Sequence, residues 1–240
     1  MGGALEEWVK DIFSISLHID DEQERLVRLS QVFSYLGNQN NPPDIILRNG
    51  DAIEVKKVAS KDATLALNSS YPKNKLFAHS PLITQSCRQC EENWVQKDIL
   101  YIVGVVPKNQ TLHSLFMLYG EDYCANPDTY ERIRQAISTG IQTIPDIEFT
   151  STNELAKVKK VDPLGITDLR VRGMWSIASP FKVFDYICKR DLSKSFNFAC
   201  IINQEKYHSF NNTILIENLI GRIDGFNIQD VYIKNPNNPA

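Results

Sequence analysis

The chain has no long hydrophobic run, no basic segment leading into an apolar one near its start, and no excess of positive charge. No apolar stretch approaches the roughly 20 residues that a transmembrane helix needs, and the first residues lack the pattern of a signal peptide. The net charge of −3 argues against a protein that coats nucleic acid nonspecifically, because such binding depends on clustered lysine and arginine. We therefore expect a soluble, cytoplasmic protein.

Cysteine is also scarce, and its pattern excludes a disulfide framework. Five cysteines are an odd number, in a chain without an export signal, so free thiols are favoured. Cys87 and Cys90 have the spacing of metal ligands, but no second pair follows at the distance of a zinc site. We expect reduced cysteines rather than bound zinc.

The 240 residues, 42% of them hydrophobic, are enough for one generous domain. Periodicity and turn signals predict a hairpin over 44–57 and other regular elements: helices over 3–15, 21–30, 84–95 and 127–138, and strands over 31–37, 98–106 and 112–120. This order indicates an α/β fold, a mixed central sheet flanked by helices. We assign residues 1–142 to the core and residues 143–240, where the pattern weakens, to an extension of the same domain.

The segment NPPDIILRNGDAIEVKK, residues 41–57, carries the polar residues of most interest. Two short apolar runs flank Asn49-Gly50, which is the strongest short signal for a β-hairpin. Glu54 and Lys56 stand in the second run, the one place where an acidic residue is followed two positions later by lysine. Alternation along a strand places both side chains on one face and their apolar neighbours on the other. The polar pair is therefore expected to converge beside the core.

The length of the hairpin loop decides where Asp44 lies. A two-residue loop turns Asp44 away from Glu54. A three-residue loop, with Gly50 in the left-handed conformation, pairs Leu47 with Asp51 and sets Asp44 directly across from Glu54. Two carboxylates with Cβ atoms about 5 Å apart repel each other unless a cation lies between them. The second register therefore predicts a metal site.

Such a site suits Mg²⁺, which keeps several waters and binds through one or two carboxylates and a substrate phosphate. The expected ligands are Asp44, Glu54 and the backbone carbonyl of Val55. Lys56 would orient or help deprotonate a water and stabilise negative charge that develops on phosphorus. Glu6 borders the apolar face of the first helix and is either a further catalytic acid at this site or a partner of the helix dipole.

Pro43-Asp44 followed by Glu54-Val55-Lys56 resembles the PD-(D/E)XK nuclease signature, and Gly2 to Glu6 is similar to the G-x-x-L-E helix start of that superfamily. The resemblance to the NgoPII-type restriction endonucleases extends over nearly the whole chain, through ALEEWVKD, VFSYLGNQNNPPD, LRNGDAIEVKK, LALNSSYPK, DPLGITDLRVRGMW and KNPNNPA. It implies a PD-(D/E)XK core and a Mg²⁺-dependent type II enzyme that cuts double-stranded DNA within GGCC. It also implies a companion DNA methyltransferase, and cleavage that leaves 5′-phosphate and 3′-hydroxyl ends.

A palindromic target is most simply read by a twofold homodimer. Reading G·C pairs calls for arginine or lysine toward guanine and for an acceptor toward cytosine. Asp168, Arg170 and Arg172 stand at alternate positions, so they share a face if their segment is a strand. The alternative is a surface strand with a charged outer side. We expect residues 143–240 to supply DNA-recognition and dimer elements.

Ser69, Ser70 and Lys73 follow the catalytic strand by one loop and are candidate contacts to phosphate or base, although a solvated loop explains them equally well. Two other functions stay open for the chain. One is a structure-selective or repair nuclease with the same metal site. The other is a DNA-binding protein without chemistry, in which the carboxylates and Lys56 form only a buried ionic cluster.

Overall fold

A mixed sheet forms the centre of the protein, whose computed structural model describes residues 3–38, 41–109 and 111–237. Within these ranges the sheet has seven strands. Six follow one another in the order β1 (Phe33–Tyr35), β2 (Ile45–Leu47), β3 (Ala52–Val58), β6 (Gln96–Val105), β7 (Ser114–Tyr119) and β11 (Asn197–Ile201), and β5 (Lys75–Phe77) pairs with β6. The pairs β3/β6 and β7/β11 are parallel and the others antiparallel. The predicted α/β fold class with a mixed sheet is confirmed.

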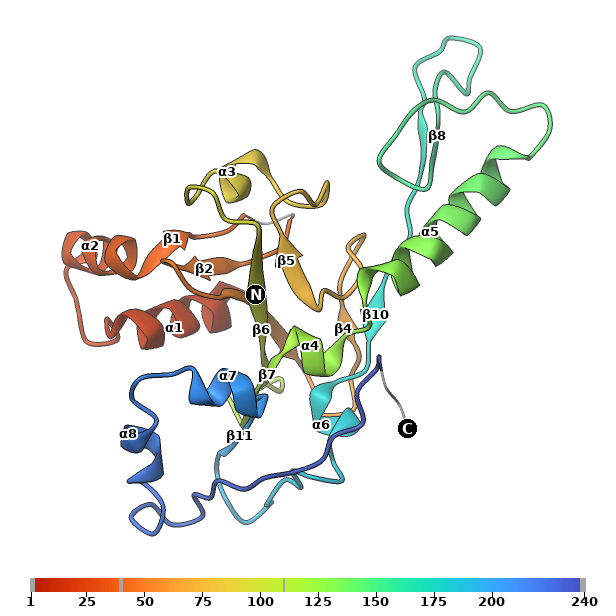
Figure 1. Ribbon diagram of the computed structural model, residues 1–240. Helices are drawn as coiled ribbons and strands as arrows, with labels where there is room; N and C mark the ends of the chain where they lie inside the picture. Colours follow the sequence, from red (N-terminus) through yellow and green to blue (C-terminus); the bar gives the residue numbers. More distant parts are fainter. Residues whose placement is uncertain (1–2, 39–40, 110, 238–240) are drawn as a thin grey trace.

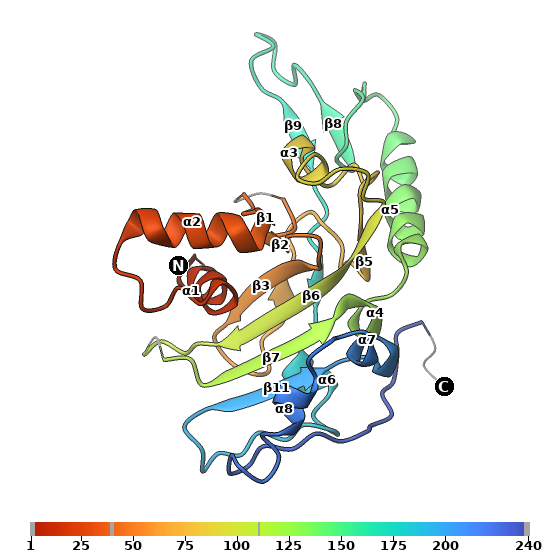
Figure 2. The ribbon, with the colours of Figure 1, turned by 60° about the vertical axis from the view of Figure 1, so that its left-hand side comes forward.

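Two apolar clusters cover the two faces of this sheet. On one face, α1 (Gly3–Ser14) and α2 (Glu22–Val32) contribute Leu5, Val9 and Leu29, which pack against Ile53 and Val55 of β3. The cluster on the opposite face contains Ala52 of β3 together with Tyr101 and Phe116. Leu65 of β4 (Leu65–Ala66) and Tyr123 of α4 (Gly120–Tyr123) also belong to it. Figure 2 shows α1 and α2 together on one side of the sheet. The alternation expected for β3 is therefore observed, with its apolar positions divided between both clusters.

The remaining helices are mostly short. They are α3 (Gln85–Arg88), α5 (Pro127–Gln142), α6 (Pro180–Val183), α7 (Gln204–His208) and α8 (Ile214–Glu217). Among the described residues, no helix is long and apolar enough to cross a membrane. The predicted helices over 3–15, 21–30 and 127–138 are confirmed, and Asp21 caps the second by accepting a hydrogen bond from the Gln23 amide. The helix start proposed at Gly2 falls outside the described residues.

The helix predicted over 84–95 is wrong in extent, because only Gln85–Arg88 is helical. Thr84 begins it by accepting a hydrogen bond from the Cys87 amide at 3.1 Å. The Trp94 indole then donates to the Arg88 carbonyl at 3.0 Å, and Asn93 takes a left-handed conformation with φ 56°. These two features turn the chain toward β6 and end the helix early.

An arm projects from the body of the protein (Figure 1). It consists of α5 and residues 149–172, in which β8 (Ala156–Val158) and β9 (Leu169–Val171) form an antiparallel hairpin. Helix α5 holds the hairpin through Ser138 Oγ, which donates to the Leu155 carbonyl at 2.8 Å. From the base of the arm the chain continues into β10 (Ser176–Ile177), which pairs with β4. Residues beyond 143 thus contribute both to the arm and, through β11, to the central sheet.

Gly120, at the start of α4, is packed too closely for any side chain. A Cβ atom there would lie 2.4 Å from the Lys73 carbonyl oxygen and 2.6 Å from that of Asn74. Because backbone atoms do not move away cheaply, Gly120→Ala is expected to lower the free energy of unfolding by about 1–3 kcal/mol in urea denaturation. Gly140→Ala in α5 is the matched control, since a Cβ there meets no atom of the described residues within 4 Å. The control should be neutral or stabilising by up to about 1 kcal/mol, and equal losses in both variants would contradict the packing argument.

Candidate functional site

The loop between β2 and β3 has three residues, Arg48 to Gly50. Ile45 pairs with Ile53, and the Leu47 amide donates to the Asp51 carbonyl at 2.9 Å. This is the register of the three-residue loop, and that prediction is confirmed.

The conformation predicted inside the loop is wrong. Asn49, with φ 56°, is the left-handed residue, and Gly50 is not among the residues of positive φ. Asn tolerates this conformation, and the Asn49 amide donates to Glu91 Oε1 at 2.8 Å. Gly50 instead allows close packing, since a Cβ there would lie 3.1 Å from the Leu47 Cβ.

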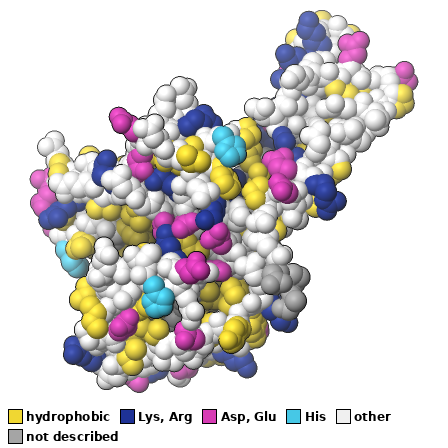
Figure 3. Space-filling model, in the orientation of Figure 1, with side chains coloured by type: hydrophobic (Ala, Val, Ile, Leu, Met, Phe, Trp, Pro, Cys, Tyr) yellow, Lys and Arg dark blue, Asp and Glu magenta, His cyan; other side chains and the backbone are white. Residues whose placement is uncertain are grey.

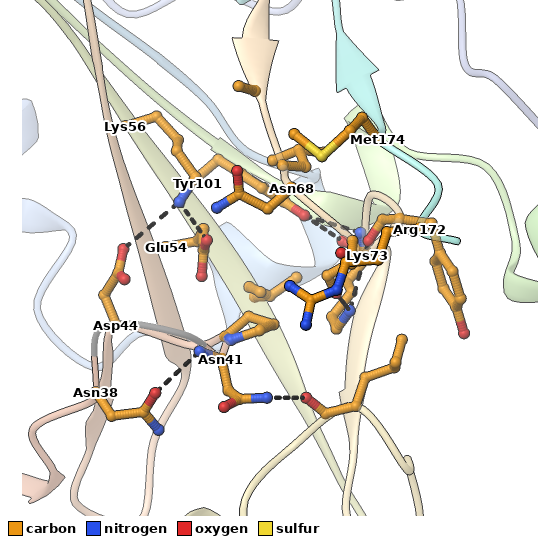
Figure 4. Close-up of a pocket in the computed structure, with 18 of the residues that line it drawn as sticks. Asn38, Asn41, Asp44, Glu54, Lys56, Asn68, Lys73, Tyr101, Arg172 and Met174 are labelled. Atoms are coloured by element: carbon orange, nitrogen blue, oxygen red, sulfur yellow. Dashed lines mark hydrogen bonds and ion pairs between the residues drawn. The ribbon is translucent and has the colours of Figure 1, made fainter. Parts of the chain in front are cut away.

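The hairpin brings Asp44, Glu54 and Lys56 together. The Asp44 amide donates to the Ile53 carbonyl at 3.1 Å, and Asp44 Oδ2 accepts from the Val55 amide at 2.6 Å. Lys56 Nζ lies 2.5 Å from Glu54 Oε1 and 4.0 Å from Asp44 Oδ2. Figure 4 shows the three side chains pointing toward one another at the edge of a cavity. The backbone of β3 therefore fixes both carboxylates beside one ammonium group.

The charges of this cluster are not balanced. Glu54 is 7% exposed, and its buried Oε2 atom has no hydrogen-bond partner among the residues that the structure describes. Burial, followed by the charge of Glu54, raises the pKa of Asp44 to about 7. Burial alone would lower the pKa of Lys56, but the charges of Glu54 and Asp44 outweigh it and raise that pKa above its ordinary value. The site therefore has two carboxylates for one ammonium and lacks a positive charge.

The donor set fits a hard divalent cation that keeps water in its coordination shell. Among the described residues there is no group of three or more His, Cys, Asp or Glu that could hold a metal. Mg²⁺ needs fewer protein ligands, because waters and a substrate phosphate complete its shell. Among the described residues Glu54 Oε2 has no hydrogen-bond partner, and the pKa of Asp44 is raised. Both features indicate negative charge that a bound cation would compensate. The Val55 carbonyl faces the same side as the Val55 amide, toward Asp44, because both groups of one strand residue point to the same neighbour.

The cluster lines a cavity of about 710 Å³. Ser69, Ser70 and Lys73 line it from the loop after β4, and Arg170 and Arg172 line it from the base of the arm. Figure 3 shows basic and acidic side chains near where the arm meets the body. The structure thus gathers five of the six predicted DNA-contacting residues around the carboxylates.

Lys73 is the most deeply placed cation of the cavity, with 6% of the residue exposed. Its Nζ donates to Ser70 Oγ at 2.5 Å and lies 4.9 Å from the centre of the Tyr71 ring. Burial lowers the pKa of Lys73 to about 8, although the charge of Glu54 acts in the opposite direction. Because this pKa is near neutral, an anionic ligand beside Lys73 would stabilise the charged form of its side chain.

Glu6 and Asp168 do not line the cavity. Glu6 Oε1 accepts from Lys10 Nζ at 2.7 Å, and Asp168 Oδ2 lies 3.1 Å from Lys157 Nζ. The charge of Glu6 still contributes to raising the pKa of both Asp44 and Lys56. Glu6 therefore lies near the site, outside its wall, whereas Asp168 is held on the arm.

Sequence reasoning missed Glu154 and Tyr101, which both line the cavity. Tyr101 pairs with Glu54 across β3 and β6, and strand register could have found it. Glu154 belongs to no motif, and its role depends on contacts with Arg170 and Arg172 across the hairpin. Only the folded arm brings these residues together.

Comparison with known proteins gives a match over the full length of the chain. The model of the family described as NgoPII restriction endonuclease matches residues 1–234. The type II restriction enzyme NgoPII of Neisseria gonorrhoeae is 54% identical over 240 residues, which cover 100% of this chain and 84% of that protein. No solved structure matches the chain. The chain therefore belongs to the NgoPII restriction endonuclease family and is a type II site-specific deoxyribonuclease.

Proposed function

We propose that this enzyme hydrolyses both strands of DNA within the palindrome GGCC and uses Mg²⁺ as its cofactor. The convergence of Asp44, Glu54 and Lys56 on one cavity is the observation that carries the metal-dependent chemistry. The resemblance of the whole chain to NgoPII-type enzymes supports the target. A homodimer with one active site for each strand would suit the twofold symmetry of such a target. We place the enzyme in the cytoplasm, where a companion methyltransferase would protect the host's own sites.

Asp44, Glu54 and the Val55 carbonyl would hold the Mg²⁺ ion. When bound, the ion supplies polarisation of a phosphate oxygen and neutralises negative charge in the transition state. The ion would stabilise Glu54 Oε2 most, because this atom is buried and has no hydrogen-bond partner in the described part of the chain. Glu6 would act from outside the cavity wall, through the field that its carboxylate exerts on Asp44 and Lys56.

Lys56 would orient the attacking water and stabilise the charge that develops on phosphorus. Its raised pKa favours this role over that of a proton acceptor, because the ammonium form persists at neutral pH. The Glu54 carboxylate, 2.5 Å from Lys56 Nζ, fixes the position of that ammonium group. Lys56 is thus an electrostatic catalyst whose position depends on a metal ligand.

Ser69, Ser70 and Lys73 would contact the DNA backbone close to the cut. A phosphate near Lys73 would favour its charged form and replace the contact with Ser70. Arg170 and Arg172 would lie toward the bases from the arm side of the cavity. Asp168 stays a proposed acceptor for cytosine N4 and would have to leave Lys157 to reach DNA.

End-sequencing of the products from a plasmid of known sequence tests this function. In Mg²⁺, all ends should map inside GGCC and carry 5′-phosphate and 3′-hydroxyl groups. Nicks at junctions or mismatches would show a repair nuclease instead. A gel shift in Ca²⁺ without any cleavage in Mg²⁺ or Mn²⁺ would show a binding protein.

Proton competition at Asp44 should make the metal requirement depend on pH. With a pKa of about 7, Asp44 is mostly ionised at pH 8 and mostly protonated at pH 6. Because the ligand must be deprotonated to bind metal, the Mg²⁺ concentration that gives half-maximal cleavage should rise about tenfold from pH 8 to pH 6. Saturating Mg²⁺ should restore most of the rate at pH 6. The same half-maximal concentration at both pH values would exclude Asp44 as a ligand of raised pKa.

A further inference from the structure

Two arginines at the base of the arm converge on one carboxylate. Arg170 donates from Nε to Glu154 Oε2 at 2.8 Å and from Nη2 to Oε1 at 2.7 Å, and Arg172 donates from Nε to Oε1 at 2.5 Å. The Glu154 side chain is 15% exposed, whereas those of Arg170 and Arg172 are 54% and 49% exposed. Glu154 is therefore the enclosed partner, and both guanidinium groups face open space.

The two arginines are not equivalent. Arg170 uses the Nε and Nη2 edge of its guanidinium on Glu154, but Arg172 uses only Nε. Within the described part of the chain, neither Nη group of Arg172 has a hydrogen-bond partner. Figure 4 shows the Arg172 guanidinium directed into the cavity. Bidentate recognition needs two parallel N–H donors on one free edge. Arg170 has already committed one of its donor edges to Glu154 through two hydrogen bonds, whereas Arg172 is held by one bond and keeps both Nη groups for a ligand.

Helix α5 fixes the position of Glu154. Arg134 Nη2 donates to the Asn153 carbonyl at 2.5 Å, and Ser138 Oγ donates to the Leu155 carbonyl at 2.8 Å. Across the hairpin, the Leu155 amide donates to the Val171 carbonyl at 3.0 Å. The carboxylate thus stands between two anchored residues and is a rigid support for the guanidinium groups.

We propose that Arg172 reads a guanine of the target in the major groove, with Glu154 and Arg170 as positioning residues. This inference rests on the proposed function. Guanine O6 and N7 form an acceptor pair that matches the two free Nη groups. A phosphate presents a similar pair, but the Glu154 carboxylate beside Arg172 Nε repels an anion more than an uncharged base edge. With Glu154 the group carries a net charge of only +1, so it attracts a phosphate less strongly than two unpaired arginines would.

The test compares cleavage of a GGCC duplex with cleavage of duplexes changed at one base pair. Arg172→Lys keeps the charge and loses the paired donors, so discrimination should fall roughly 10- to 100-fold. Arg132→Lys on the exposed side of α5 is the matched control and should retain wild-type discrimination. Replacing one guanine at a time with 7-deazaguanine needs no variant. At one position it should slow the wild-type enzyme about tenfold and leave Arg172→Lys almost unaffected.

Glu154→Gln tests the positioning role. The change raises the net charge of the group from +1 to +2, so binding to duplexes without GGCC should strengthen and become more sensitive to salt. Cleavage of GGCC should slow at the same time. If Glu154 had a purely structural role, its replacement would instead weaken the binding of every duplex equally. Equal losses on all duplexes in Arg172→Lys, or equal effects of 7-deazaguanine on both enzymes, would overturn the inference. If the wild-type enzyme still cuts at discrete GGCC sites, the proposed function survives that result.

Discussion

Replacing Lys56 with alanine is expected to lower the rate of DNA cleavage at least about 100- to 1,000-fold, the loss typical of removing a group that stabilises transition-state charge. The ammonium group lies 2.5 Å from Glu54 Oε1 and faces the cavity. Binding to GGCC should change little, because the carboxylates and the arm residues stay in place. Single-turnover cleavage in Mg²⁺ and gel shifts in Ca²⁺ measure the two effects separately.

Lys57→Ala provides the control for this variant. Lys57 follows Lys56 in β3, and alternation along the strand turns it to the opposite face. Its replacement should leave cleavage within about twofold of the wild-type rate, because its side chain does not line the cavity. Wild-type cleavage by Lys56→Ala would remove Lys56 from the mechanism. Loss of DNA binding together with cleavage would make Lys56 a contact for DNA rather than a catalyst.

Asp44→Asn is expected to abolish cleavage and yet stabilise the metal-free protein. Because the pKa of Asp44 is raised to about 7, its favourable contribution to stability is full below its ordinary pKa near 4 and is lost as pH rises through about 7. At pH 8 the wild-type protein holds two carboxylates beside one ammonium group, and asparagine removes one of these charges. The Tm of Asp44→Asn in EDTA at pH 8 should therefore exceed that of wild type by about 2–8 °C.

Thermal unfolding with and without Ca²⁺ completes this test. Ca²⁺ should raise the Tm of the wild-type protein, since a ligand that binds only the folded state stabilises it. It should have little effect on Asp44→Asn, which lacks one of the two carboxylates. At pH 5 the metal-free Tm values of the two proteins should converge. A variant that is less stable than wild type at pH 8 would show that Asp44 supports the fold rather than a cation.

The hairpin could be predicted because its signals are local. Asn49-Gly50 indicated the hairpin and limited its loop to two lengths, between which the structure decides, and alternation placed Glu54 and Lys56 on one face. The strongly apolar β6 was equally clear, since a buried strand of this length has few other interpretations. The core of the candidate site therefore followed from about 15 consecutive residues.

The rest of the site depends on contacts between distant residues. Glu154 meets Arg170 and Arg172 only because α5 holds the hairpin, and nothing in its neighbourhood in the sequence indicates this contact. The predicted helix over 84–95 ended early because the Trp94 indole took the Arg88 carbonyl. The position of the Asn-rich end could not be predicted either, since it depends on Asn237 Oδ1, which accepts a hydrogen bond from the Asn126 amide at the start of α5. Hydrogen bonds of particular side chains decided each of these features, and the helix and strand propensities of the residues do not contain them.

A crystal of the protein grown with Mn²⁺ and a GGCC duplex tests the central claim most directly. The anomalous difference map should show a peak between the carboxylates of Asp44 and Glu54, with the Val55 carbonyl and a DNA phosphate oxygen around it. Lys56 Nζ should lie beside this peak without coordinating it. An empty position between the two carboxylates, or a manganese ion bound elsewhere near the scissile phosphate, would contradict the account.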